Sequence, residues 1–100
     1  MSRIPPAVIE AVDARRMETC EATGWPTLHV QYHHRRPYRM GGRPADDALQ
    51  NIAENILGLC RRHHEWAHAH GPGDPHGFML RDDQDPRDVP VRSDPRLGRC

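Results

Sequence analysis

The sequence predicts a small α+β domain with an N-terminal helix, two strands, a second helix and an extended polar C-terminal tail. Three observations favour this class. Apolar residues recur at helical spacing near the start of the chain. β-prone residues alternate over 27–34, and a second apolar run occupies 56–60. Two histidines four positions apart then mark the segment 61–70 as a helix with both imidazoles on one face.

Composition limits how much stability burial can supply. Hydrophobic residues make up 36% of the 100 residues and aromatic residues only 5%, so the core must be thin and a bound metal would add stability. This length permits one domain. We expect an N-terminal helix over 1–17, a central domain over 18–80 and a Pro- and Asp-rich tail over 81–100.

Turn and cap residues set the bounds of the predicted elements. Pro5 and Pro6 suit the first turn of a helix, whose apolar stripe indicates a packing role. Gly71 follows the helix 61–70 and ends it. A short additional strand is predicted over 77–80, and the polar, Pro-rich residues that follow predict the extended tail.

Alternation along the first strand separates two neighbouring histidines. His33 and His34 fall on opposite faces, which suits side chains that do different jobs. Gln31 lies two positions before His33, and its amide oxygen could accept a hydrogen bond from an imidazole N–H.

Basic charge gathers around these histidines although the chain carries no net charge. Every basic side chain other than histidine is an arginine, which can contact phosphate through two N–H groups at once. The loop that follows His34 is rich in arginine, which favours contact with a nucleic-acid backbone over a merely solvated loop. Four arginines are therefore candidate DNA contacts: Arg35, Arg36, Arg39 and Arg61.

The most specific pattern joins the adjacent pair His33 and His34 to Asn55, His64 and His68. Eight residues separate Asn55 from His64, and three separate His64 from His68. With its surroundings, this pattern resembles the HNH endonucleases, which have the ββα-metal (treble-clef-like) nuclease fold, and in particular small HNH proteins of bacteriophages and prophages. The resemblance covers roughly residues 18–92 and includes the stretches Val30–Pro37, Met40–Gly42 and Asn55–Cys60. Val89–Val91 also resembles the tail of the phage proteins, which would allow this part of the tail to dock on the body.

The resemblance implies a role for each member of the pattern. His34 would be the general base, and an imidazole suits this role because its pKa lies near neutrality. Asn55 would hold the backbone of the loop that carries the histidine pair, with Asn51 as a less well placed rival for that position. The remaining histidines of the pattern would bind one divalent metal: His33, His64 and His68.

The ligand types indicate which metal would bind. Three imidazoles favour Zn²⁺, Ni²⁺, Co²⁺ or, less well, Mn²⁺, whereas Mg²⁺ prefers oxygen ligands. We expect no small-molecule cofactor.

Cysteines mark the place where many HNH proteins bind a structural zinc ion, but the set is incomplete in the sequence. Cys20, Cys60 and His63 are available, whereas Thr23 stands where the family has a further cysteine. Structural zinc sites are almost always closed by four ligands. We therefore expect a degenerate site without zinc, the alternative being a three-ligand site completed by another residue or water. Cys100 belongs to no motif.

The resemblance implies a metal-dependent DNA endonuclease that nicks DNA or cuts both strands, and it would allow a part in phage DNA packaging beside a terminase. Such a protein, encoded by a phage or prophage, would act in the cytoplasm of a bacterial host. The sequence shows neither a membrane span nor a signal peptide. The alternative is a metal-stabilised DNA-binding or adaptor module that does not cleave.

Overall fold

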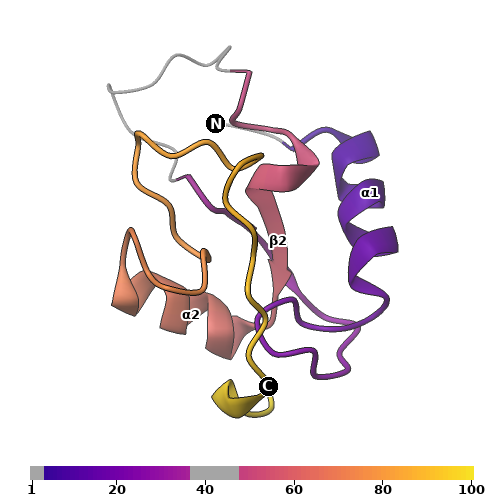
Figure 1. The fold of residues 1–100 in the computed structure, drawn as a ribbon. Coiled ribbons are helices and arrows are strands. Elements are labelled where there is room, and N and C mark those ends of the chain that lie inside the picture. The colour runs from indigo at the N-terminus through magenta and orange to yellow at the C-terminus, as the bar shows by residue number, and fades with distance from the viewer. Residues whose placement is uncertain (1–3, 37–47) are drawn as a thin grey trace.

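Two helices lie on either side of a two-stranded antiparallel sheet in the computed structural model of this protein, which describes residues 4–36 and 48–100 (Figure 1). The α+β class predicted from the sequence is confirmed. In the two stretches that the structure describes, no helix combines the length and apolar character that a membrane span requires. In chain order the elements, with η for a 3-10 helix, are α1 (Pro6–Arg16), β1 (Gln31–His34), η1 (Ala53–Asn55), β2 (Ile56–Leu59), α2 (Arg61–His70) and η2 (Pro95–Leu97).

An arginine at the end of α1 explains where the first strand begins. The helix starts with Pro6, within the predicted range, and its last residue, Arg16, is buried. The guanidinium of Arg16 donates hydrogen bonds to the carbonyl oxygens of Thr27 at 3.0 Å and Leu28 at 3.3 Å. Because these oxygens are occupied by a side chain rather than by a neighbouring strand, β1 starts at Gln31 and not at residue 27 as expected.

The sheet places β2 in the middle of the molecule. β1 and β2 pair antiparallel, with Gln31 opposite Leu59 and His34 opposite Ile56. All four residues of β2 are buried, and α1 and α2 both contact this strand. The hydrophobic core forms around β2 from Cys20, Ala22, Leu57, Leu59, Cys60, Ala67, Phe78 and Met79.

The second helix has the bounds that the sequence predicts. α2 runs from Arg61 to His70, and Gly71 follows it with a positive φ of 77°. His63 and Ala67 are buried on its inner side. Trp66 is partly buried against the core.

The segment 77–80 is buried but forms no strand, so that prediction is wrong. Its backbone N–H and C=O groups form hydrogen bonds with groups other than those of a neighbouring strand. The N–H of Leu80 donates to the carbonyl oxygen of Arg35 at 2.7 Å, and the carbonyl oxygen of Phe78 lies 2.7 Å from the imidazole of His33. An apolar run can therefore enter a core as an irregular segment when other groups satisfy its backbone.

Residues 81–100, termed the C-terminal segment, fold back over the body of the protein. Figure 1 shows this segment, orange to yellow, crossing in front of β2. The N–H of Arg92 donates to the carbonyl oxygen of His76 at 2.8 Å, and the N–H of Asp94 donates to that of Ala22 at 2.8 Å. The expectation of an extended tail is corrected, since two apolar side chains of the segment pack against the core: Val91 and Leu97.

Gly77 lies directly against the C-terminal segment, and its substitution tests how closely the segment packs. Its φ is 78°, and an added Cβ would lie 2.8 Å from the backbone carbonyl oxygen of Pro90. We expect Gly77→Ala to lower the free energy of unfolding by about 2–4 kcal/mol, because a left-handed alanine and an overpacked contact are both unfavourable. Denaturation by urea measures this loss.

Gly24→Ala is the matched control, since Gly24 has a φ of 81° and no atom within 4 Å of an added Cβ. In this variant the free energy of unfolding should fall only by the cost of a left-handed alanine, about 1–2 kcal/mol. Equal losses in the two variants would contradict the close contact between Gly77 and the C-terminal segment.

Candidate functional site

The three predicted metal ligands come together between β1 and α2. Ligand atoms of His33, His64 and His68 lie within 4.8 Å of one another, so these imidazoles could hold one metal ion. The Nε2 atoms of His64 and His68 are 3.2 Å apart. The centre of the His33 ring lies 5.0 Å from that of His64 and 5.2 Å from that of His68. This group is termed the histidine cluster.

A backbone carbonyl determines which nitrogen of His33 carries the proton. Its Nε2 lies 2.7 Å from the carbonyl oxygen of Phe78, and such an oxygen can only accept a hydrogen bond. Nε2 therefore carries the hydrogen, and the lone pair is on Nδ1. Burial, with a smaller contribution from the neighbouring histidines, lowers the pKa of His33 to about 4. The ring is thus neutral at pH 7, which is the form that binds metals.

Gln31 determines the protonated nitrogen of His64 in the same way. Its Oε1 lies 2.6 Å from Nδ1 of His64, which places the hydrogen on Nδ1 and leaves the lone pair on Nε2, the atom that faces His68. Burial and the proximity of His68 lower the pKa of His64. The sequence indicated that Gln31 could accept such a bond, and the structure shows that His64 is the donor.

The histidine cluster is buried on one side and open on the other. His33 is 2% exposed, His64 is half-buried and His68 is exposed. Structural metal sites are closed by protein ligands, whereas catalytic sites keep a position open for water or substrate. With three candidate ligands and one open side, the histidine cluster has the geometry of the second kind.

Asn55 connects the backbone that follows the histidine pair to the turn before β2. It is fully buried, and its Oδ1 accepts a hydrogen bond from the backbone N–H of Arg36 at 2.8 Å. Its Nδ2 donates to the carbonyl oxygen of Gln50 at 2.9 Å. These bonds are of the kind that the resemblance implies for a holding residue.

Asn51, which the sequence offered only as a rival for Asn55, contacts His34 itself. Its Oδ1 lies 2.9 Å from Nε2 of His34, so that nitrogen carries the hydrogen and the lone pair is on Nδ1. His34 is also close enough to His33 for its charge to lower the pKa of that ring. The residue type of Asn51 was the only signal in the sequence, because spacing along a turn does not indicate which side chain it faces.

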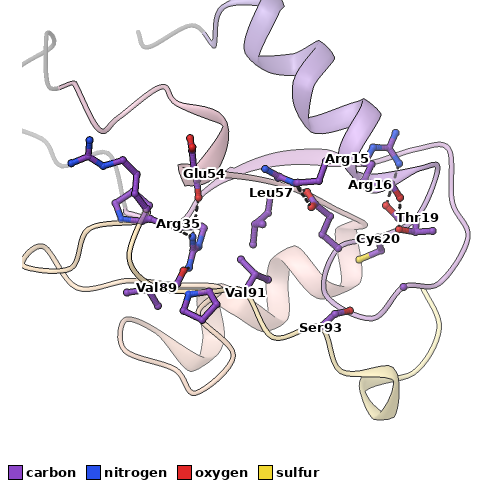
Figure 2. Close-up of a pocket in the computed structure, with 15 residues that line it drawn as sticks. Arg15, Arg16, Thr19, Cys20, Arg35, Glu54, Leu57, Val89, Val91 and Ser93 are labelled. Carbon is purple, nitrogen blue, oxygen red and sulfur yellow. Dashed lines mark hydrogen bonds and ion pairs between the residues drawn. The ribbon is translucent and has the colours of Figure 1, made fainter.

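Arg35 is buried and bonded to the protein's own backbone. It is 2% exposed, and Figure 2 shows it between Glu54 and Val89. The expectation that Arg35 contacts DNA is wrong, because its guanidinium is already occupied. It donates at distances between 2.6 and 3.1 Å to the carbonyl oxygens of Glu54, Gly77, Pro86 and Val89.

The other three predicted DNA contacts differ in accessibility. Arg36 is 6% exposed and donates to the carbonyl oxygen of Asp82 at 3.3 Å, so it faces the protein rather than solvent. Arg61 is exposed on the first turn of α2, where it forms an ion pair with Glu65 at 3.2 Å. Arg39 lies outside the described residues.

A second group of candidate ligands forms where the sequence predicted an incomplete one. Cys20, Cys60 and His63 lie together, and Cys100 joins them, with four ligand atoms within 4.8 Å of one another. All three cysteines are free thiols. The expectation of a degenerate site is corrected in favour of the alternative, three candidate ligands completed by another residue, because Cys100 supplies a fourth. This group is termed the cysteine cluster.

A cleft of about 480 Å³ lies between α1 and the C-terminal segment (Figure 2). Two of the arginines that line it have partners: Arg15 forms an ion pair with Glu21 at 2.7 Å, and Arg35 is bonded as described above. No member of the histidine cluster lines it. The histidine cluster is therefore separate from this cleft, whereas Cys20 of the cysteine cluster lines it.

Comparison of the chain with protein-family models, curated proteins and solved structures found no match. The function is therefore argued from the geometry and chemistry of the site itself.

Gln31→Ala tests whether the hydrogen bond from His64 prepares that ring as a ligand. Loss of a partner behind a metal-binding histidine lowers metal affinity by about 10–100-fold. We expect this loss for Ni²⁺, measured by isothermal titration calorimetry. Gln84→Ala is the matched control, because Gln84 accepts its bond from the backbone of Arg81, and it should bind as the wild type does. Equal affinity in all three proteins would be inconsistent with this arrangement.

Proposed function

We propose that this protein is a metal-dependent DNA endonuclease of the HNH type, which hydrolyses phosphodiester bonds with one divalent metal and a histidine base. One observation carries the proposal. His33, His64 and His68 converge on one point, and the adjacent His34 is oriented by Asn51. A metal site with an open side and a base next to it suits the hydrolysis of a phosphodiester.

The order of elements supports a ββα-metal fold. β1, β2 and α2 follow one another in this order in the chain, and η1 directly precedes β2. One predicted ligand and the predicted base lie on β1, and the other two ligands lie on α2. This is the placement that the resemblance implies, with two antiparallel strands and a helix around one ion.

The donor set fits a transition metal. Three neutral imidazoles suit Zn²⁺, Ni²⁺, Co²⁺ or Mn²⁺ better than Mg²⁺, which prefers oxygen ligands. An ion held there supplies a Lewis acid for the phosphate and stabilises the charge on the leaving oxygen.

His34 takes the proton from the attacking water. With its Nε2 bonded to Asn51, the lone pair on Nδ1 is the group that can accept a proton. A positioned general base contributes about 10²–10⁴-fold to a rate. Asn55 keeps His34 aimed by holding the backbone N–H of Arg36.

Cleavage of supercoiled plasmid tests this proposal. The purified protein should nick or linearise the plasmid with Ni²⁺, Co²⁺, Mn²⁺ or Zn²⁺, as followed by gel electrophoresis. His34→Ala should lower the rate by about 10²-fold or more, because the base is lost. Its Ni²⁺ affinity should stay at the wild-type value, because His34 is not one of the three ligands.

His70→Ala is the matched control, since His70 stacks on Trp66 with ring centres 3.7 Å apart and belongs to neither cluster. This variant should cleave as the wild type does. Equal cleavage rates in His34→Ala and wild type would show that His34 is not the general base. DNA binding without cleavage under all four metals would favour the non-cleaving DNA-binding module.

Asn51→Asp tests the hydrogen bond to His34. A carboxylate stabilises a protonated imidazole beside it, so the acidic limb of the pH–rate profile should move to higher pH. Asn51→Ala should lower kcat while Ni²⁺ affinity is unchanged. A pH–rate profile that does not move in Asn51→Asp would show that Asn51 has no part in positioning the base.

A further inference from the structure

We propose that the cysteine cluster binds one Zn²⁺ ion through Cys20, Cys60, His63 and Cys100, and that this ion fastens the C-terminal segment to the body of the protein. The inference does not rest on the endonuclease proposal, since the two clusters share no residue. It concerns how the chain is held together rather than what it cleaves.

The distances in the cluster suit one tetrahedral ion. Nδ1 of His63 lies 3.1 Å from Sγ of Cys60, 3.6 Å from Sγ of Cys100 and 3.8 Å from Sγ of Cys20. Zinc–sulfur bonds of about 2.3 Å and zinc–nitrogen bonds of about 2.0 Å at tetrahedral angles place nitrogen and sulfur roughly 3.5 Å apart. The observed separations bracket this value.

A hydrogen bond to His63 accounts for the position of one of the three sulfurs, not of all three. A neutral imidazole nitrogen has one lone pair, which accepts one S–H donor. Three sulfur atoms nevertheless gather around Nδ1 of His63. A cation at the centre satisfies all three sulfurs and the nitrogen at once.

The C-terminal segment orients His63 as a ligand. Nε2 of His63 lies 3.2 Å from the carbonyl oxygen of Leu97, which places the hydrogen on Nε2 and the lone pair on Nδ1, facing the sulfurs. Metal-binding histidines almost always donate their other N–H in this way. Leu97 and Cys100 both belong to the C-terminal segment, so this segment supplies one ligand and orients another.

Burial and donor type select a structural zinc ion. Cys20, Cys60 and His63 are at most 5% exposed. Sγ of Cys20 accepts a hydrogen bond from the backbone N–H of Cys60 at 3.4 Å, which suits a thiolate. Three sulfurs and one imidazole favour zinc over cations that prefer oxygen, and four protein ligands close the site.

The fastened segment also supports the residue that follows His34. Pro86 and Val89 of the segment provide two of the carbonyl oxygens that hold the guanidinium of Arg35. Release of the segment removes these partners. In a domain with so thin a core, zinc binding supplies folding stability that apolar burial does not.

Cobalt substitution tests the site separately from the histidine cluster. Co²⁺ bound by thiolates gives a charge-transfer band in the near ultraviolet, which a site made only of imidazoles does not give. With Co²⁺ in excess, the wild-type protein should show this band, and Zn²⁺ should abolish it. Cys100→Ser should lose about a third of the intensity, since two of the three thiolates remain. Arg99→Ser, a change at the neighbouring residue, should keep the full band.

Limited digestion with trypsin tests the fastening. Arg87 and Arg92 are exposed cleavage points in the C-terminal segment. Zinc should slow cleavage there about tenfold or more in the wild type and in Arg99→Ser, and should have no effect in Cys100→Ser. Circular dichroism of the same samples separates lost protection from global unfolding.

Three results would overturn the zinc site: no charge-transfer band in the wild type, an undiminished band in Cys100→Ser, or a disulfide between two of the cysteines in the purified protein. Zinc binding that leaves trypsin cleavage unchanged would overturn the fastening role. Plasmid cleavage reports on neither result, so failure of this inference and failure of the endonuclease proposal are distinguishable.

Discussion

Four hydrogen bonds decide which ring nitrogen carries the proton in four of the five histidines at the two sites, and both candidate metal sites depend on them. In each case a carbonyl or amide oxygen accepts from the nitrogen that faces away from the cluster or reaction centre. Because such an oxygen can only accept, the remaining nitrogen presents a lone pair to a metal or a proton. The pairs are His33 with Phe78, His34 with Asn51, His63 with Leu97 and His64 with Gln31.

In both clusters an imidazole N–H donates to a carbonyl or amide oxygen, but the two clusters differ in how far they are open to solvent. The histidine cluster has three candidate ligands and an exposed edge at His68, so it is open to solvent on that side. The cysteine cluster has four ligands, three of them buried. Both depend on α2, where the neighbouring residues His63 and His64 point about 100° apart around the helix axis and so serve different sites. A ten-residue helix thereby joins a candidate structural site to a candidate reactive one.

Local spacing was sufficient to predict α2 with two histidines on one face, because helix periodicity acts over a few residues. The meeting of these histidines with His33 of β1 was implied only by the resemblance to HNH endonucleases. Contacts between distant residues were not predictable in this way. Arg35 stands at the start of an arginine-rich loop, which predicts an exposed side chain. One of the carbonyl oxygens that hold its guanidinium nevertheless belongs to Pro86, 51 residues further along the chain. Cys100 meets His63 across 37 residues and belongs to no motif. Both contacts arise because the C-terminal segment folds back, and its polar, Pro-rich composition predicts the opposite.

Nitrogen-15 NMR of the imidazole rings measures the protonated nitrogen of each histidine directly, and so tests the constraint on which both sites depend. In the metal-free protein at neutral pH, we predict hydrogen on Nε2 of His33, His34 and His63 and on Nδ1 of His64. The opposite tautomers in these rings, or rapid exchange between the two forms, would refute the claim that the protein prepares its imidazoles in advance.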